Sequence, residues 1–168
     1  MNQLFRVIIL TLVSFIPNIV FAETLSSDAQ ERGINSTCLS YLGQIGESYD
    51  LNGLNITFAH PDEPSLYPSL HLSSKKYNNG SSVFSATLSP DGEYCYVSTV
   101  NVTEINSQNC NDITMLKVAE DPTLHVTIYA DGDYSIITPL DNNYQIILIS
   151  SGEQSCTMTE SRMFWPGR

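Results

Sequence analysis

The clearest sign of the fold in this chain of 168 residues is the stretch VFSATLSPDGEYCYVSTV, residues 83–100. It holds two runs rich in β-branched and aromatic residues, 83–88 and 93–100. Between them lies a segment of Ser, Pro, Asp and Gly, which is typical of a tight turn. Strand-favouring residues on both sides of turn residues predict an antiparallel hairpin.

After this hairpin, polar turn or loop segments continue to alternate with strand-favouring segments. The polar residues 101–112 are predicted to form a loop, and residues 113–118 the next strand. Two later turns resemble the first. In each of the three, an Asp followed by Gly or Asn stands shortly before a tyrosine, which is Tyr94, Tyr134 or Tyr144. Turn chemistry accounts for this resemblance, and a duplicated hairpin unit is the alternative.

Residues 27–47 are predicted to form one helix. Ser27 and Gln30 fit a capping box at its start, and the helix carries one apolar stripe. The stripe consists of Ile34, Cys38, Tyr41, Leu42 and Ile45. Three glycines within these residues each weaken a helix by about 1 kcal/mol relative to alanine, so this helix needs packing against a sheet.

One helix followed by a meander of about seven strands predicts an α+β fold, with the helix packed on a predominantly antiparallel sheet. A sheet curled around the helix is a close variant. An all-β sandwich or barrel with a peripheral helix is the alternative architecture. Residues 23–168 are expected to form a single disulfide-stabilised domain.

Residues 1–22 are predicted to be an export signal. Arg6 precedes an apolar run, residues 7–16, and the segment ends on Val20-Phe21-Ala22, which a signal peptidase accepts. The apolar run is roughly half of the about 20 residues that a membrane-spanning helix needs. We therefore expect a periplasmic or secreted protein with no stable membrane span after processing; a retained N-terminal anchor is the alternative.

The composition is strongly acidic, with 18 Asp and Glu against 7 Lys and Arg and a net charge of −11. The acidic residues are spread along the chain instead of being gathered in a tail. Such a charge repels nucleic acid and anionic lipid headgroups. It favours either a cationic partner or simple solubility.

All four cysteines, Cys38, Cys95, Cys110 and Cys156, follow the predicted signal. An even number in an oxidising compartment predicts two disulfides, for which three connectivities exist. We favour Cys95–Cys110 together with Cys38–Cys156, which would tie the predicted helix to the last strand. No C-x-x-C spacing is present, and no histidine lies near a cysteine in the sequence, so a metal-binding or redox role is not predicted.

No motif nominates a catalytic residue, a metal site or a cofactor. His60 shares a proline-rich loop with Asp62 and Glu63, but this spacing lacks the rigid geometry of known zinc motifs. Within the predicted strand 124–130, alternation places three polar or aromatic residues on one face. These residues, His125, Thr127 and Tyr129, form a possible binding face.

These observations favour an exported, non-catalytic binding protein. Its partner would be a basic envelope or extracellular protein. The chain would bind this partner as an inhibitor or an immunity protein binds its target. The first alternative is a small secreted hydrolase whose site is assembled from residues distant in the sequence. The second is a structural or surface-assembly component.

Overall fold

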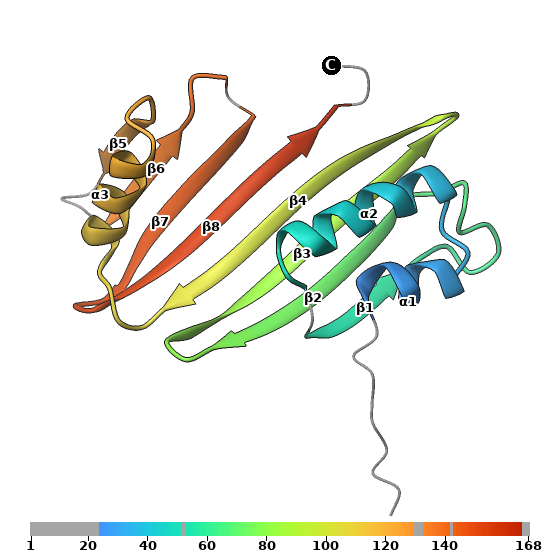
Figure 1. Cartoon of the computed structure of the whole chain (residues 1–168), viewed down its shortest axis with the longest axis horizontal. Helices are drawn as coiled ribbons and strands as arrows, with labels where there is room; N and C mark the ends of the chain where they lie inside the picture. Colours follow the sequence, from blue (N-terminus) through green and yellow to red (C-terminus); the bar gives the residue numbers. More distant parts are fainter. Residues whose placement is uncertain (1–23, 52, 130–132, 142, 166–168) are drawn as a thin grey trace, which may run out of the picture.

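The computed structural model describes residues 24–51, 53–129, 133–141 and 143–165 (Figure 1). The predicted export signal, residues 1–22, lies outside them. The helices are α1 (Leu25–Glu31), α2 (Ser36–Ser48) and α3 (Cys110–Glu120). The strands are β1 (Leu54–Phe58), β2 (Ser69–Tyr77), β3 (Gly80–Asp91), β4 (Tyr94–Ile105), β5 (His125–Tyr129), β6 (Tyr134–Thr138), β7 (Tyr144–Gly152) and β8 (Ser155–Phe164). Among the described helices, none is long and apolar enough to cross a membrane.

The strands form one antiparallel sheet of eight in the order β1-β2-β3-β4-β8-β7-β6-β5. The expected α+β architecture with a meandering sheet is confirmed. The hairpin predicted from residues 83–100 is β3–β4, paired from Gly80↔Ile105 to Asp91↔Tyr94. Its turn lies slightly later than predicted, after Asp91, where Gly92 takes a φ of +61° that favours glycine.

The sheet consists of two halves that meet at its centre. The first half is α1 and α2 followed by β1–β4, and the second is α3 followed by β5–β8. In both halves the last strand is the innermost one, so β4 pairs with β8. Because these two strands are antiparallel neighbours, an approximate twofold axis normal to the sheet relates the halves. The two halves thus share one order of elements, a helical segment followed by four strands.

Both helical layers cover the same face of the sheet (Figure 1). Cys95 of β4 is bonded to Cys38 of α2, and Cys156 of β8 is bonded to Cys110 of α3. Cys156 pairs with Ile105 in the sheet register, and Ile105 points to the same side of β4 as Cys95. The two disulfides therefore leave the sheet on one side, and the opposite side carries no helix among the described residues.

Each half has its own core between helices and strands. The first packs α1 on β1 and β2 and α2 on β3 and β4, and the second packs α3 on β6, β7 and β8. The first core contains Leu25, Ala29, Ile34, Cys38, Leu42, Ile45, Leu51, Phe84, Ala86, Leu88, Cys95 and Val97. The second contains Cys110, Ile113, Ile137, Ile146, Leu148 and Cys156.

The prediction of a single helix over residues 27–47 was wrong, because two helices replace it. The first begins after Thr24, whose Oγ1 accepts from the Ser27 N–H, so the proposed Ser27 capping box does not form. Gly33 has a φ of +76°, which ends α1. Asn35 then caps α2 by accepting from the N–H groups of Thr37 and Cys38.

The interpretation of residues 101–118 was also wrong. Strand β4 continues to Ile105, through the first five residues of the predicted polar loop, because its residues pair with both β3 and β8. Residues 113–118, predicted as a strand, lie within helix α3, which Asn109 caps by accepting from the Asp112 N–H. The β-branched residues of this segment favoured a strand locally, and burial of Ile113 on the sheet outweighs that preference.

The favoured cysteine pairing was wrong as well. The bonds are Cys38–Cys95 and Cys110–Cys156, and each joins a helix to the second residue of the innermost strand of the same half. The prediction assumed that the N-terminal helix covers the C-terminal strand. The strand order instead places α2 over β3 and β4.

We expect the two disulfides to stabilise the fold by similar amounts. They span 57 and 46 residues, which corresponds to about 4 kcal/mol each in the chain-entropy model. Replacing Cys38 and Cys95 together by alanine, or Cys110 and Cys156 together, should lower the free energy of unfolding in urea by about that amount. Peptide mapping without reduction provides the control for connectivity. A loss near zero for either pair would contradict the assignment.

Candidate functional site

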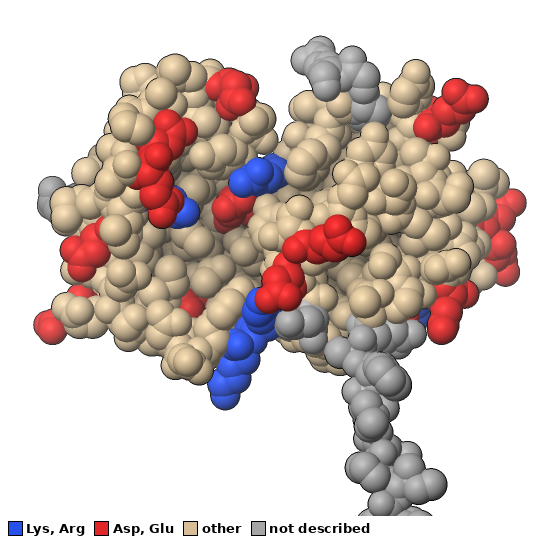
Figure 2. Space-filling model, viewed as in Figure 1, with Lys and Arg blue, Asp and Glu red and all other residues tan. Residues whose placement is uncertain are grey.

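A cleft runs between the two halves on the helix-covered face, over the paired strands β4 and β8. Figure 2 shows this face hollowed between its two halves. A cavity of about 250 Å³ lies in this cleft against α2, and Arg162 is one of the residues that line it. In the sheet register Arg162 lies opposite Thr99, and Glu160 lies opposite Asn101.

A cluster of polar and aromatic side chains occupies the floor of this cleft. Glu160 Oε1 accepts from Tyr49 OH at 2.9 Å and from Arg162 Nε at 2.7 Å. The Arg162 guanidinium also lies 4.8 Å from the centre of the Tyr144 ring. Burial raises the pKa of Tyr49 to about 12, and the negative charge of Glu160 adds to this effect.

This cluster joins the two halves and leaves the cleft nearly neutral. Tyr49 follows α2 in the first half, whereas Glu160 and Arg162 belong to β8 in the second. Because Arg162 is paired with Glu160, the pair presents little net charge to a ligand. Its geometry therefore favours a structural role, in which the Tyr49–Glu160 hydrogen bond joins the halves and Arg162 balances the charge of the carboxylate.

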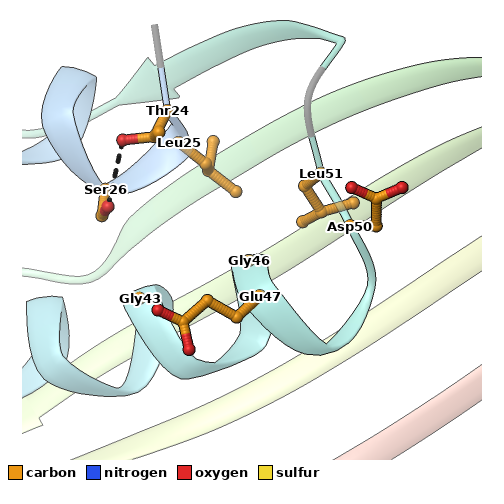
Figure 3. A pocket seen from close by; sticks show the side chains of 8 residues that line it. All are labelled: Thr24, Leu25, Ser26, Gly43, Gly46, Glu47, Asp50 and Leu51. Atoms are coloured by element: carbon orange, nitrogen blue, oxygen red, sulfur yellow. Dashed lines mark hydrogen bonds between the residues drawn. The ribbon is translucent and has the colours of Figure 1, made fainter.

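A second cavity, of about 220 Å³, lies between α1 and α2, and we call it the α1–α2 pocket (Figure 3). It is lined by Thr24, Leu25, Ser26, Gly43, Gly46, Glu47, Asp50 and Leu51. The space exists partly because two lining residues lack side chains. A Cβ placed on Gly43 or Gly46 would meet nothing within 4 Å.

The α1–α2 pocket combines an apolar wall with acidic groups. Leu25 and Leu51 are buried beside it, and Glu47 and Asp50 are exposed. Asp50 forms an ion pair with Lys75, whereas Glu47 forms no ion pair with any described residue. A long side chain with an aliphatic stem and a cationic head, such as arginine or lysine, matches such walls.

The residues predicted as a possible binding face, His125, Thr127 and Tyr129, lie on β5 at the edge of the sheet. All three are exposed and point to the helix-free side, so their predicted alternation agrees with the register of β5 and β6. None of them lines the α1–α2 pocket or the central cleft. Their role in binding stays a prediction.

His60 forms local contacts within its loop. Its Nδ1 accepts from the N–H groups of Asp62 and Glu63, and its ring stacks on Tyr67 with 4.5 Å between centres. Within the described part of the chain, no three His, Cys, Asp or Glu side chains lie in a group that could hold a metal ion.

A buried network around His71 was missed by the sequence interpretation. Ser69 Oγ lies 2.8 Å from Nε2 of His71, and Thr57 Oγ1 lies 3.1 Å from Nδ1. Burial lowers the pKa of His71 to about 4, so the ring is neutral at physiological pH. The serine–histidine contact resembles part of a hydrolase site, but Ser69 is only 4% exposed and is out of a substrate's reach. The alternation of Ser and His in β2 was the only sequence signal for this network.

Comparisons of the chain with protein-family models, with curated proteins and with solved structures found no match. The candidate sites therefore rest on the geometry and chemistry of their own residues.

We expect His71 to make the fold acid-sensitive. Its pKa of about 4 lies below the ordinary value of 6.5, so the unfolded chain takes up a proton first as the pH falls. Stability should drop progressively between those values, by about 3 kcal/mol in total from this group. His71→Gln keeps hydrogen-bonding capacity without titrating, and urea unfolding at pH 7 and at pH 4.5 should show a smaller drop for this variant.

The control for this prediction is His125→Gln, because His125 is exposed on the edge strand. That variant should retain the pH dependence of the unaltered protein. An equal drop in stability for His71→Gln and the unaltered protein would contradict the assignment.

Proposed function

We propose that this protein is an exported, non-catalytic binding protein, whose α1–α2 pocket takes a basic side chain of a cationic partner protein. The observation that carries this proposal is the combination of acidic and apolar walls in that pocket. Such a protein occupies its partner as an inhibitor or an immunity protein does.

The charge distribution supports a cationic partner. Of the five basic side chains that the structure describes, four form ion pairs with carboxylates: Arg32, Lys75, Lys117 and Arg162. The excess of acidic residues in the chain therefore leaves many carboxylates without a basic partner. Figure 2 shows acidic side chains on both halves of the helix-covered face. Such a field accelerates the approach of a positively charged protein and weakens at high salt.

The spread negative charge has no defined shape, whereas the α1–α2 pocket offers a shaped site for one side chain. The aliphatic part of an arginine or lysine fits against Leu25 and Leu51, and its cationic head reaches Glu47 at the rim. The hydroxyls of Thr24 and Ser26, which lie 3.3 Å apart, are further acceptors at the same opening (Figure 3). A single inserted side chain of this kind acts as an anchor in many protein interfaces.

The two disulfides fit an oxidising compartment. Together with the predicted export signal, they support a periplasmic or secreted location for the proposed activity. The partner is then a basic envelope or extracellular protein that meets this protein after export.

A labelled oligo-arginine peptide tests the proposed partner chemistry. Fluorescence anisotropy should show binding at low salt that is lost at high salt, because the attraction is largely electrostatic. Glu47→Gln should weaken binding by about three- to tenfold, since it removes a carboxylate at the rim of the pocket. Gly46→Leu should weaken it further by filling a space that is open in the fold.

The matched control is Glu153→Gln, which removes the same charge from an exposed turn in the other half. This variant should bind the peptide almost as well as the unaltered protein. Equal weakening by Glu47→Gln and Glu153→Gln would contradict the pocket, and no binding at low salt would overturn the proposed partner chemistry.

A further inference from the structure

The helix-free face of the sheet is unusually apolar for an exposed surface. Of the 21 exposed large apolar side chains among the described residues, twelve lie on it by the strand register. They are Leu54, Ile56, Phe58, Leu70, Val83, Tyr94, Tyr96, Val102, Tyr129, Tyr134, Ile149 and Met163. Serine and threonine side chains lie between them on the same face. Exposed apolar side chains gathered in this number on one face are typical of an interaction surface.

The same face carries few charges. Among the described strand residues that point to it, the Lys, Arg, Asp and Glu residues are Lys76, Asp91 and Glu104 alone. In a protein with a net charge of −11, this is where a second copy can approach without strong repulsion. A cationic partner, by contrast, finds little on this face to bind.

The positions of Lys76 and Glu104 are complementary for self-association. Lys76 pairs with Ser81 in the register, and Ser81 pairs with Glu104, so the two charges lie in one row on either side of β3. If two copies pack face to face about a twofold axis that passes over Val83 close to the direction of β3, strand β2 of one copy lies over β4 of the other. Lys76 then faces Glu104 of the second copy, and this contact occurs twice.

We propose that two copies of this chain associate through their helix-free faces, with the β3 strands crossing at Val83 and two symmetric Lys76–Glu104 ion pairs beside the crossing. Sheets that pack face to face cross at about −30°. Asp91 lies eight residues from Val83 along β3, or about 26 Å at 3.3 Å per residue. Because the two β3 strands diverge from the crossing point, Asp91 lies away from Asp91 of the second copy.

The overlap is large enough for a stable dimer. In this arrangement β1, β2, β3, β4 and β8 face the same five strands of the second copy in reverse order. Five strands about 4.8 Å apart and about 30 Å long cover roughly 700 Å² per copy. This is close to the about 800 Å² per partner of a standard interface.

Analytical ultracentrifugation of the oxidised protein over a wide range of concentration tests this proposal. The unaltered protein should sediment as a dimer that dissociates on dilution. Val83→Asp should abolish dimerisation, because it buries two like charges at the crossing point. Val83 is 55% exposed in the monomer, so this substitution leaves the core intact.

A charge exchange tests the arrangement within the dimer. Lys76→Glu and Glu104→Lys should each weaken dimerisation by about tenfold, because twofold symmetry counts each change twice. The variant with both substitutions should regain most of the affinity. Lys117→Glu, on helix α3, is the matched control and should leave dimerisation unchanged. A monomer at all concentrations, a dimer insensitive to Val83→Asp, or no recovery in the double variant would overturn the proposal.

Discussion

The antiparallel pairing of β4 with β8 is the contact on which the rest of the structure depends. It runs from Val97↔Phe164 to Ile105↔Cys156 and is the only strand pairing between the two halves in the described sheet. Because it is central and antiparallel, it turns two helix-plus-meander units into one continuous sheet with both helical layers on one side. The hydrogen bonds of Tyr49 and Arg162 to Glu160 lie directly over this seam, so the polar cluster strengthens the same junction.

This arrangement separates the surface into two chemically different faces. The helix-covered face carries many of the carboxylates, the cleft and the α1–α2 pocket, whereas the opposite face is a pleated surface of β-branched, aromatic and hydroxyl side chains. The proposed dimer and the proposed cationic partner would therefore use different residues. A dimer formed through the helix-free faces would present two acidic pockets on its opposite sides, so a single partner would gain affinity only if its basic segments reached both.

Much of the sheet could be predicted from the sequence, because period-two alternation and turn residues report directly on local backbone geometry. The order of the strands could not, since nothing in residues 94–105 or 155–164 indicates that these segments pair with each other. That missing order also explains the wrong cysteine pairing. Helix α3 was hidden by β-branched residues such as Ile113, which only tertiary packing holds in a helix.

The α1–α2 pocket could not be predicted from the sequence. Gly43 and Gly46 were interpreted as weaknesses of a helix, which they are in isolation. Their role in leaving space beside α1 emerges only when the break at Gly33 folds α1 back along α2. The His71 network likewise joins three residues from two neighbouring strands, and its burial depends on the helices above them.

The disulfide map has a consequence for how the chain matures. Each bond joins cysteines that follow one another in the sequence, the first with the second and the third with the fourth. A polypeptide that emerges N-terminus first into an oxidising space meets its correct partners in that same order. If the chain is exported as proposed, Cys38 and Cys95 would be able to close before Cys156 emerges, and oxidation in the order of the sequence would give the native connectivity.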